Sequence, residues 1–363
     1  MDDCGGIPQL GYGEFSEWLH KKVGSQRIPI SGSLEVTLRC NLRCQHCYIP
    51  PEQRANRKAN ELSLVEIQRI LDEVTDAACL WMLLTGGEPL LRRDFLDIYT
   101  CARRKGLIVT LFTNGTLLTP RIADYLAEWR PFNIEITLYG ATQETYERVT
   151  GIPGSYARCR RGIDLLLERK LPLSLKTMVM TLNQHELEQM KAFAASLGVR
   201  FRYDPMIHPA IDGSKRPTFL RLTPEEVVSL DLSDPERFSI WQELYKNNKV
   251  VPISDRRMYL CGAGKQGFYI DSTGCLNICS SSRQPYYNLL KGSFKEGWEH
   301  FIPMVTAGEY RDSYACTGCE LRLVCAQCIA MEVLEHGESG KKVEFLCQIT
   351  KLRRDTFALR YDI

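Results

Sequence analysis

Residues 34–47 read LEVTLRCNLRCQHC, and this stretch decides the fold. Its first five residues alternate apolar and polar side chains, which predicts a β-strand that runs directly into three cysteines. Cys40, Cys44 and Cys47 follow the spacing CxxxCxxC. Three thiolates can hold three irons of a four-iron cluster and leave the fourth iron open to a non-protein ligand. Zinc sites favour paired CxxC knuckles with four ligands, so the stretch predicts a reactive iron–sulfur centre at the end of a strand.

From residue 34 to residue 203 the chain alternates short β-rich runs with amphipathic helical patterns. This alternation predicts repeated βα units around a parallel sheet, an α/β fold with a (βα)6 pattern. The predicted strands are 34–38, 80–85, 108–113, 133–139, 173–181 and 199–203. A capping box at Ser63 predicts a helix whose apolar stripe comprises Val65, Ile67, Ile70, Leu71 and Val74. Further helices are predicted over 94–105, after Thr119, over 155–169 and from Asn183 to Gly198.

Two motifs in this order resemble those of the radical SAM enzymes. Cys40 to Cys47, with His46 before the last cysteine, is similar to their CxxxCxΦC loop, and residues 86–89 are similar to their GGEP motif. The resemblance extends from Leu34 to about Asp204 and implies a partial (βα)6 barrel that binds S-adenosylmethionine (SAM). In that family the methionyl group of SAM chelates the open iron of a [4Fe-4S] cluster. Reductive cleavage then gives a 5′-deoxyadenosyl radical, which abstracts hydrogen from the substrate.

The same resemblance implies a set of SAM contacts. Gly86 and Gly87 let backbone carbonyls approach the methionyl ammonium, and Glu88 offers a carboxylate there. His46 and Tyr48 would flank the adenine, while polar residues at the ends of strands three and four would meet the ribose. A lysine on strand five could neutralise the methionyl carboxylate, although strand lysines are more often solvated. The implied set is His46, Tyr48, Gly86, Gly87, Glu88, Pro89, Asn114, Thr137 and Lys176. No residue is identified as a catalytic base.

A second group of cysteines lies in the C-terminal third and resembles the SPASM domain, which holds two auxiliary [4Fe-4S] clusters. By the family pattern the outer cluster is held by Cys316, Cys319, Cys325 and Cys347, and the inner one by Cys261, Cys279 and Cys328. Cys275 is a candidate fourth inner ligand, but it lies about 13 Å from Cys279 if the strand is extended. The alternative is a structural double zinc ribbon. Four more cysteines are expected to be ordinary buried thiols: Cys4, Cys79, Cys101 and Cys159.

The resemblances divide the chain into five expected segments. These are an N-terminal extension over 1–32, the radical SAM partial barrel over 33–204, a bridging helical segment over 205–258, a small cysteine-rich α+β SPASM domain over 259–348 and a C-terminal helix over 349–363. A hairpin is expected around 271–274 and a helix over 294–301.

The net charge and the N-terminal sequence limit the classes of partner that we expect. The formal net charge is +2, which provides no global field for a polyanion, so nucleic acid is not expected. The start Met1-Asp2-Asp3 is unlike a signal peptide, and the run 77–84 is too short to span a membrane. We therefore expect a cytoplasmic protein with no membrane partner, in which dense cysteines bind metal.

SPASM relatives mostly modify peptides, so the resemblance implies a maturase that crosslinks, epimerises or otherwise alters a ribosomally made precursor peptide. Ser280 occupies the position where sulfatase-maturing relatives carry an aspartate base, which disfavours sulfatase maturation. Only 33 residues precede the first strand, too few for a peptide-recognition domain, so a separate recognition protein is expected. A flavodoxin- or ferredoxin-type electron donor is also expected. The alternatives are a tetrapyrrole or haem-biosynthesis radical SAM enzyme and a non-enzymatic metal-cluster scaffold or electron relay.

Overall fold

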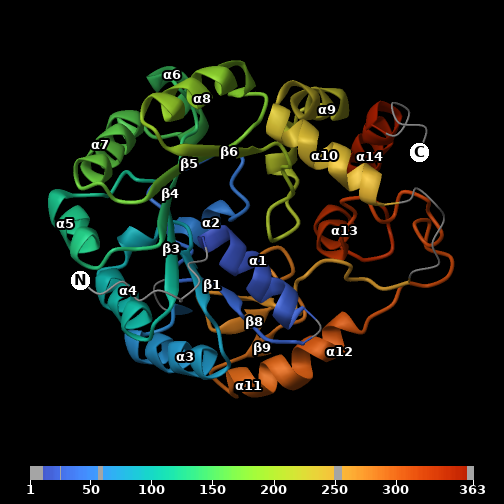
Figure 1. The fold of residues 1–363 in the computed structure, drawn as a ribbon, viewed down its shortest axis with the longest axis horizontal. Helices are drawn as coiled ribbons and strands as arrows, with labels where there is room; N and C mark the ends of the chain where they lie inside the picture. The colour runs from blue at the N-terminus through green and yellow to red at the C-terminus, as the bar shows by residue number, and fades with distance from the viewer. Residues whose placement is uncertain (1–10, 25, 56–59, 249–255, 358–363) are drawn as a thin grey trace, which may run out of the picture.

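The computed structural model describes residues 11–24, 26–55, 60–248 and 256–357. Cys4, expected to be a buried thiol, lies outside these residues. The architecture is one mixed sheet with helices around it (Figure 1). Six parallel strands lie side by side in chain order: β1 (Ser31–Glu35), β2 (Trp81–Thr85), β3 (Ile108–Thr113), β4 (Asn133–Thr137), β5 (Leu173–Met178) and β6 (Arg200–Asp204). The predicted α/β fold with six βα units is confirmed.

The first strand begins and ends three residues earlier than the predicted range of 34–38. The ladder to β2 pairs Ser31 with Trp81 and Glu35 with Thr85. Residues after Val36 leave the ladder because their carbonyls are used elsewhere: Thr37 accepts a hydrogen bond from the Gly87 amide at 2.8 Å. The alternating pattern identified the strand, but tertiary pairing set where it ends.

Helices cover the outer face of the six strands, with α3 to α8 in a ring outside the sheet (Figure 1). Their bounds are α3 (Leu64–Asp76), α4 (Phe95–Arg104), α5 (Pro120–Glu128), α6 (Gln143–Thr150), α7 (Ser155–Glu168) and α8 (Leu187–Ser196), the last preceded by a 3-10 turn, η3 (Gln184–Glu186). The Ser63 capping box is present. The predicted stripe is wrong at Val65, which is 73% exposed, whereas Ile67, Ile70, Leu71 and Val74 are buried. Val65 lies two residues before Ile67, about 200° away around a helix of 3.6 residues per turn, and so faces away from the sheet, whereas Leu64 packs against the core.

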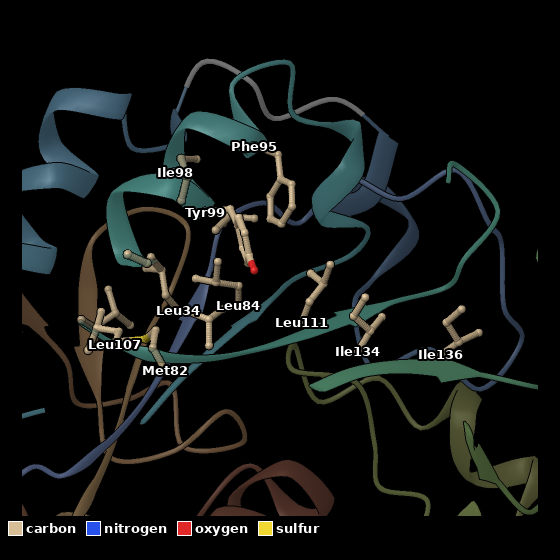
Figure 2. Packing of buried hydrophobic residues seen from close by; sticks show 14 of the residues in the cluster. Leu34, Met82, Leu84, Phe95, Ile98, Tyr99, Leu107, Leu111, Ile134 and Ile136 are labelled. Carbon is tan, nitrogen blue, oxygen red and sulfur yellow. The ribbon is translucent and has the colours of Figure 1, made fainter. Parts of the chain in front are cut away.

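Alternate residues of the strands fill the layer between sheet and helices. Figure 2 shows Leu34, Leu84 and Leu111 pointing from the sheet towards Phe95 and Tyr99 of α4. The other face of the same strands lines the interior of the partial barrel. Because side chains alternate along a strand, the residues that do not point towards the helices point into that interior.

Helices α1 and α2, near the N-terminus, lie in segments where the sequence predicted none. Helix α1 (Tyr12–Val23) packs over the starts of β2 and β7: the ring of His20 stacks on Trp81 with centroids 5.4 Å apart, and its Nδ1 lies 3.0 Å from Gln266 Oε1. Helix α2 (Pro51–Ala55) follows the first cysteine loop. The segment expected only as an N-terminal extension therefore covers part of the sheet.

The C-terminal cysteine-rich segment continues the sheet. Strand β7 (Gly267–Ile270) pairs in parallel with β1, and β8 (Cys275–Asn277) and β9 (Tyr287–Asn288) add antiparallel strands beside it. The predicted hairpin is confirmed between β7 and β8. The helix expected over 294–301 forms the continuous run α11 (Phe294–Glu296), η5 (Gly297–Phe301) and α12 (Ile302–Thr306). Phe268 of β7 packs on Phe294, with centroids 4.7 Å apart, so this segment shares the core of the barrel.

The remaining helices form a group beside β6. They are η4 (Arg216–Leu220), α9 (Pro224–Ser233), α10 (Pro235–Asn247), α13 (Ile329–His336) and α14 (Glu344–Phe357). Buried Asp231 of α9 pairs with Arg237 and Arg353, which joins α9 to α10 and α14. The C-terminal helix begins five residues earlier than the predicted 349, and its predicted end lies outside the described residues. Within the described ranges, no helix is long and apolar enough to cross a membrane.

Candidate functional site

One cavity of about 720 Å³ brings the two cysteine-bearing parts of the chain together. Its wall includes the cysteine loop that follows β1, the glycines after β2 and residues at the ends of β3 to β6. Residues 279–281 of the C-terminal segment line the same cavity. Of the predicted SAM contacts, the following line it: His46, Tyr48, Gly86, Gly87, Asn114, Thr137 and Lys176. The carboxyl ends of parallel strands converge here, where α/β folds place their ligands.

The first three cysteines lie close to one another. Burial, with smaller contributions from the Glu88 and Cys47 charges, raises the pKa of the Cys40 thiol to about 12. Cys44 is fully buried, and both other cysteines oppose its ionisation. The loop is fixed because the Arg43 amide donates to the Thr150 carbonyl at 2.8 Å. Buried thiols this close ionise only when a metal takes the charge, so the donor set fits a metal cluster.

The glycine loop packs directly on the segment that leads to these cysteines. The Gly87 amide donates to the Thr37 carbonyl and the Glu88 amide to the Arg39 carbonyl, both at 2.8 Å. A Cβ at either Gly86 or Gly87 would press on this backbone. The two glycines are therefore required for the close approach of the two loops.

Glu88 and Pro89 do not line the cavity. The sequence placed the Glu88 carboxylate at the cofactor's ammonium, but its oxygens accept from the Thr113 hydroxyl and the Asn114 amide, both at 2.7 Å, and from the Leu90 amide at 3.1 Å. Burial raises the pKa of Glu88 to about 7 despite these donors. In this arrangement Glu88 ties the ends of β2 and β3 together beneath the cavity.

Aromatic rings and a polar cluster border the cysteine loop. The His46 ring lies 5.0 Å from Tyr139, and the Tyr48 ring lies 6.0 Å from His208. Asn114 Nδ2 donates to Asn41 Oδ1 at 2.9 Å and lies 3.9 Å from Cys40 Sγ. Burial lowers the pKa of His46 to about 4, so its imidazole is neutral at physiological pH.

Lys176 lies inside the barrel and not on a solvated face. Its Nζ is 3.3 Å from Glu135 Oε2 and lies over the ring of Phe112. Burial lowers the pKa of Lys176 to about 7. Arg202 of β6 pairs with the same Glu135 carboxylate at 2.5 Å, so one carboxylate serves two cations on this wall.

Sequence reasoning missed Arg54, on α2. This side chain is 9% exposed and lines the cavity, and its charge opposes protonation of all three loop cysteines. Its Nε has no hydrogen-bond partner within the described part of the chain. The only signal in the sequence is an arginine seven positions after Cys47.

The C-terminal cysteines separate into two groups in the structure. The neighbouring Cys261 helps to raise the pKa of Cys279, and Cys279 and Cys261 help to raise that of Cys328; of these three only Cys279 lines the cavity. In a second group, Cys325 and Cys319 help to raise the pKa of Cys316, and Cys347 and Cys319 help to raise that of Cys325. The assignment of these groups to an inner and an outer cluster stays a prediction of the family pattern.

Cys275 lies apart from the inner group: besides burial, the charges acting on it are Asp271 and Arg283. All cysteines in the described ranges are free thiols. In those same ranges no three His, Cys, Asp or Glu side chains converge tightly enough to hold a single metal ion. A four-iron cluster is larger than one ion, so its ligands need not converge on one point.

Comparison with known proteins agrees with this geometry. Residues 34–194 match the family model described as the radical SAM superfamily. The chain contains a radical SAM domain. It therefore uses SAM and iron–sulfur chemistry, and the scaffold or electron-relay alternative is wrong. The matched segment begins with the β1 residue Leu34 and ends in α8.

The relatives of this chain have names that indicate different substrates. The AdoMet-dependent heme synthase of Methanosarcina barkeri is 27% identical over 325 residues, which cover 84% of this chain and 92% of the synthase. The mycofactocin maturase MftC of Mycolicibacterium smegmatis is 27% identical over 300 residues, covering 80% of this chain and 75% of the maturase. The structure of Streptococcus suis SuiB bound to precursor peptide SuiA has a TM-score of 0.63 and 16% identity, covering 93% of this chain and 82% of SuiB. The last similarity shows that the fold is shared.

Proposed function

We propose that this enzyme abstracts hydrogen from a side chain of a ribosomally made precursor peptide and so crosslinks, epimerises or otherwise modifies it. The observation that carries the proposal is the single cavity of about 720 Å³ shared by the first cysteine loop and residues 279–281. This volume lies within the range of about 300–1,000 Å³ typical of a site for one drug-sized ligand. SAM is itself such a ligand, so the remaining space suits one inserted side chain better than a whole macrocycle.

The roles of the chain's own residues follow from their positions. Cys40, Cys44 and Cys47 would hold the SAM-binding cluster, which supplies a 5′-deoxyadenosyl radical when reduced. Gly86 and Gly87 bring backbone next to this loop, and Lys176 provides a cation on the β5 wall. The surrounding apolar and aromatic wall excludes water, which would otherwise quench a radical.

The two C-terminal cysteine groups would hold two auxiliary [4Fe-4S] clusters. The inner set of Cys261, Cys279 and Cys328 reaches the cavity through Cys279, and the outer set of four lies beyond it. We propose the division into a barrel over 33–204 and an auxiliary-cluster domain over 259–348 as functional units, although the two share a sheet and a core.

The test is anaerobic reconstitution followed by reduction with SAM present. We expect about twelve irons per chain, three clusters of four, and formation of 5′-deoxyadenosine. Changing Cys40, Cys44 and Cys47 together to alanine should remove about four irons and abolish 5′-deoxyadenosine. Mass spectrometry of peptides encoded beside the enzyme should show a loss of two hydrogens for a crosslink, or deuterium gain at unchanged connectivity for an epimerisation. Cleavage of SAM with no change in any such peptide would contradict the peptide assignment.

We propose two protein partners. A separate recognition protein would deliver the precursor, and a flavodoxin- or ferredoxin-type donor would reduce the clusters. Modification should therefore require the recognition protein when a chemical reductant replaces the donor. Full turnover of the peptide without it would remove this partner from the scheme.

A haem-biosynthetic reaction is the second candidate, and one observation favours it: the heme synthase relative is covered over 92% of its length. The cations Arg54, Lys176 and Arg202 on the cavity wall could meet propionate groups of a tetrapyrrole. Porphyrin absorbance in the purified enzyme, or side-chain loss from an added tetrapyrrole, would favour this reaction over peptide modification.

A further inference from the structure

One guanidinium connects the first strand of the barrel to the loop that follows Cys279. Arg283 Nη2 lies 2.8 Å from Glu35 Oε2, and Arg283 Nε donates to the Ser280 carbonyl at 2.7 Å. Glu35 ends β1, the strand that leads to Cys40, and Ser280 directly follows Cys279. Arg283 therefore joins two segments that each carry a cysteine of a proposed cluster.

The contact is buried and its hydrogen bonds are satisfied. Glu35 is fully buried and also accepts from the Tyr269 hydroxyl at 2.7 Å and from the amide and hydroxyl of Ser272, both at 3.2 Å. The Arg283 side chain is 15% exposed and lies over the Tyr269 ring at 4.6 Å. A planar guanidinium can hold two acceptors in fixed directions, which an ammonium cannot. The arrangement therefore specifies a geometry as well as neutralising a charge.

Both ends of this contact reach the cavity. Residues 279–281 form part of its wall, and Tyr48, which follows Cys47, lines it as well. Glu35 and Arg283 are both electrostatic neighbours of the Tyr48 hydroxyl. The buried network thus spans the space between the SAM-binding loop and the wall formed by the C-terminal segment.

We propose that Arg283 is a positioning residue: through Glu35 it holds the wall formed by residues 279–281 at a fixed separation from the first cysteine loop. A substrate group in the cavity then lies within reach of the radical-generating centre. Within the loop the Ser282 amide donates to the Cys279 carbonyl at 3.2 Å, and Arg283 adds the link from this loop to β1, which we expect to limit the movement of residues 280–281. The effect on substrate rests on the proposed function, whereas the effect on the loop does not.

The experiment compares Arg283→Gln and Arg283→Lys with a matched control, Arg353→Gln. Arg353 also pairs with a fully buried carboxylate, Asp231, at 2.8 Å, but joins α14 to α9 without lining the cavity. Amide hydrogen exchange is measured on the reconstituted enzyme over peptides spanning 276–283 and 224–233, together with iron content and the ratio of modified peptide to 5′-deoxyadenosine.

With Arg283→Gln, exchange over 276–283 should become about tenfold faster or more, as expected when a charge-assisted hydrogen bond is lost, with unchanged iron content and unchanged exchange over 224–233. Product per 5′-deoxyadenosine should fall by about ten- to a hundred-fold, because a misplacement of about 1 Å can cost about 100-fold. Arg283→Lys should give exchange rates and product ratios between those of the wild type and Arg283→Gln, since an ammonium keeps the charge pair with Glu35 but loses the hydrogen bond to the Ser280 carbonyl. The lysine variant also serves as the test if Arg283→Gln does not fold.

The proposal is overturned if the Arg283 variants leave exchange over 276–283 unchanged, or if Arg353→Gln loosens that loop equally. SAM cleavage by the wild type with no peptide product would refute only the proposed function. The role of Arg283 in holding the loop would still be tested by hydrogen exchange over 276–283.

Discussion

Replacing Gly87 with alanine tests how tightly the glycine loop and the cysteine loop are packed. A Cβ at this position would press on the Arg39 carbonyl oxygen, its nearest neighbour, and would lie 2.5 Å from the Leu38 carbonyl oxygen, whereas real Cβ contacts are essentially never under 3.0 Å. The neighbours are backbone atoms, so the loops must separate by at least about 0.5 Å. Overpacking of this kind costs about 1–3 kcal/mol of stability.

The catalytic effect of Gly87→Ala should exceed its effect on folding. A displacement of about 0.5–1 Å between the glycine loop and the cysteine loop should reduce the rate of 5′-deoxyadenosine formation by about ten- to a hundred-fold. The assay is anaerobic 5′-deoxyadenosine formation by chromatography, with iron content and thermal unfolding measured on the same samples.

The control is Gly13→Ala, since a Cβ at Gly13 meets nothing within 4 Å. Gly13 lies in the first turn of α1, where alanine should leave both the stability and the rate nearly unchanged. A Gly87→Ala enzyme with full iron content and a wild-type rate would refute the reasoning about loop packing.

Three further predictions concern the charges and thiols of the site. Because burial lowers the pKa of Lys176 to about 7, the affinity for SAM should fall as the pH rises through about 7 and the ammonium is lost. Lys176→Met should remove this pH dependence and weaken SAM binding at pH 6 by about tenfold. Binding titrations between pH 6 and 8 measure both effects, and the same pH dependence in the variant and the wild type would contradict the prediction. Arg54→Gln removes a buried cation beside the first three cysteines, so the midpoint potential of the cluster that they hold should become more negative by roughly 100 mV. A redox titration followed by EPR measures this potential, and an unchanged value would argue against Arg54 lying beside that cluster. The iron content of reconstituted Cys275→Ala should equal that of the wild type, whereas Cys328→Ala should lose the iron of the inner cluster. Loss of iron in both variants would indicate that Cys275 is also a ligand of the inner cluster.

The order of the barrel could be read from the chain because its signals are local. Alternation within each strand and the capping residues Ser63 and Thr119 each depend on neighbours a few positions away. The cysteine spacing likewise identifies a cluster loop, since three thiols within eight residues can reach one cluster wherever the loop lies. These features placed six strands in the right order.

Other features of the site and the helices could not be read from local signals. Glu88 belongs to a motif that suggested a cofactor contact, yet Thr113 and Asn114 on the next strand capture its carboxylate. Arg54 carried no motif, and only the burial of α2 makes it a cation of the cavity. Val65 is exposed because it lies on the opposite face of the helix from Ile67, so it never belonged to the apolar stripe. For Glu88 the deciding neighbours, Thr113 and Asn114, are distant in sequence.

The sequence by itself determined the chemistry available to this protein: which thiols cluster, which strand precedes them and where glycines allow close approach. Tertiary structure alone decided that β7 pairs with β1, and therefore that Cys279 opens into the same cavity as Cys40. The physical reason is that strand pairing across more than 200 residues depends on backbone hydrogen bonds and shared core packing, which leave no periodic trace in the residues of either strand.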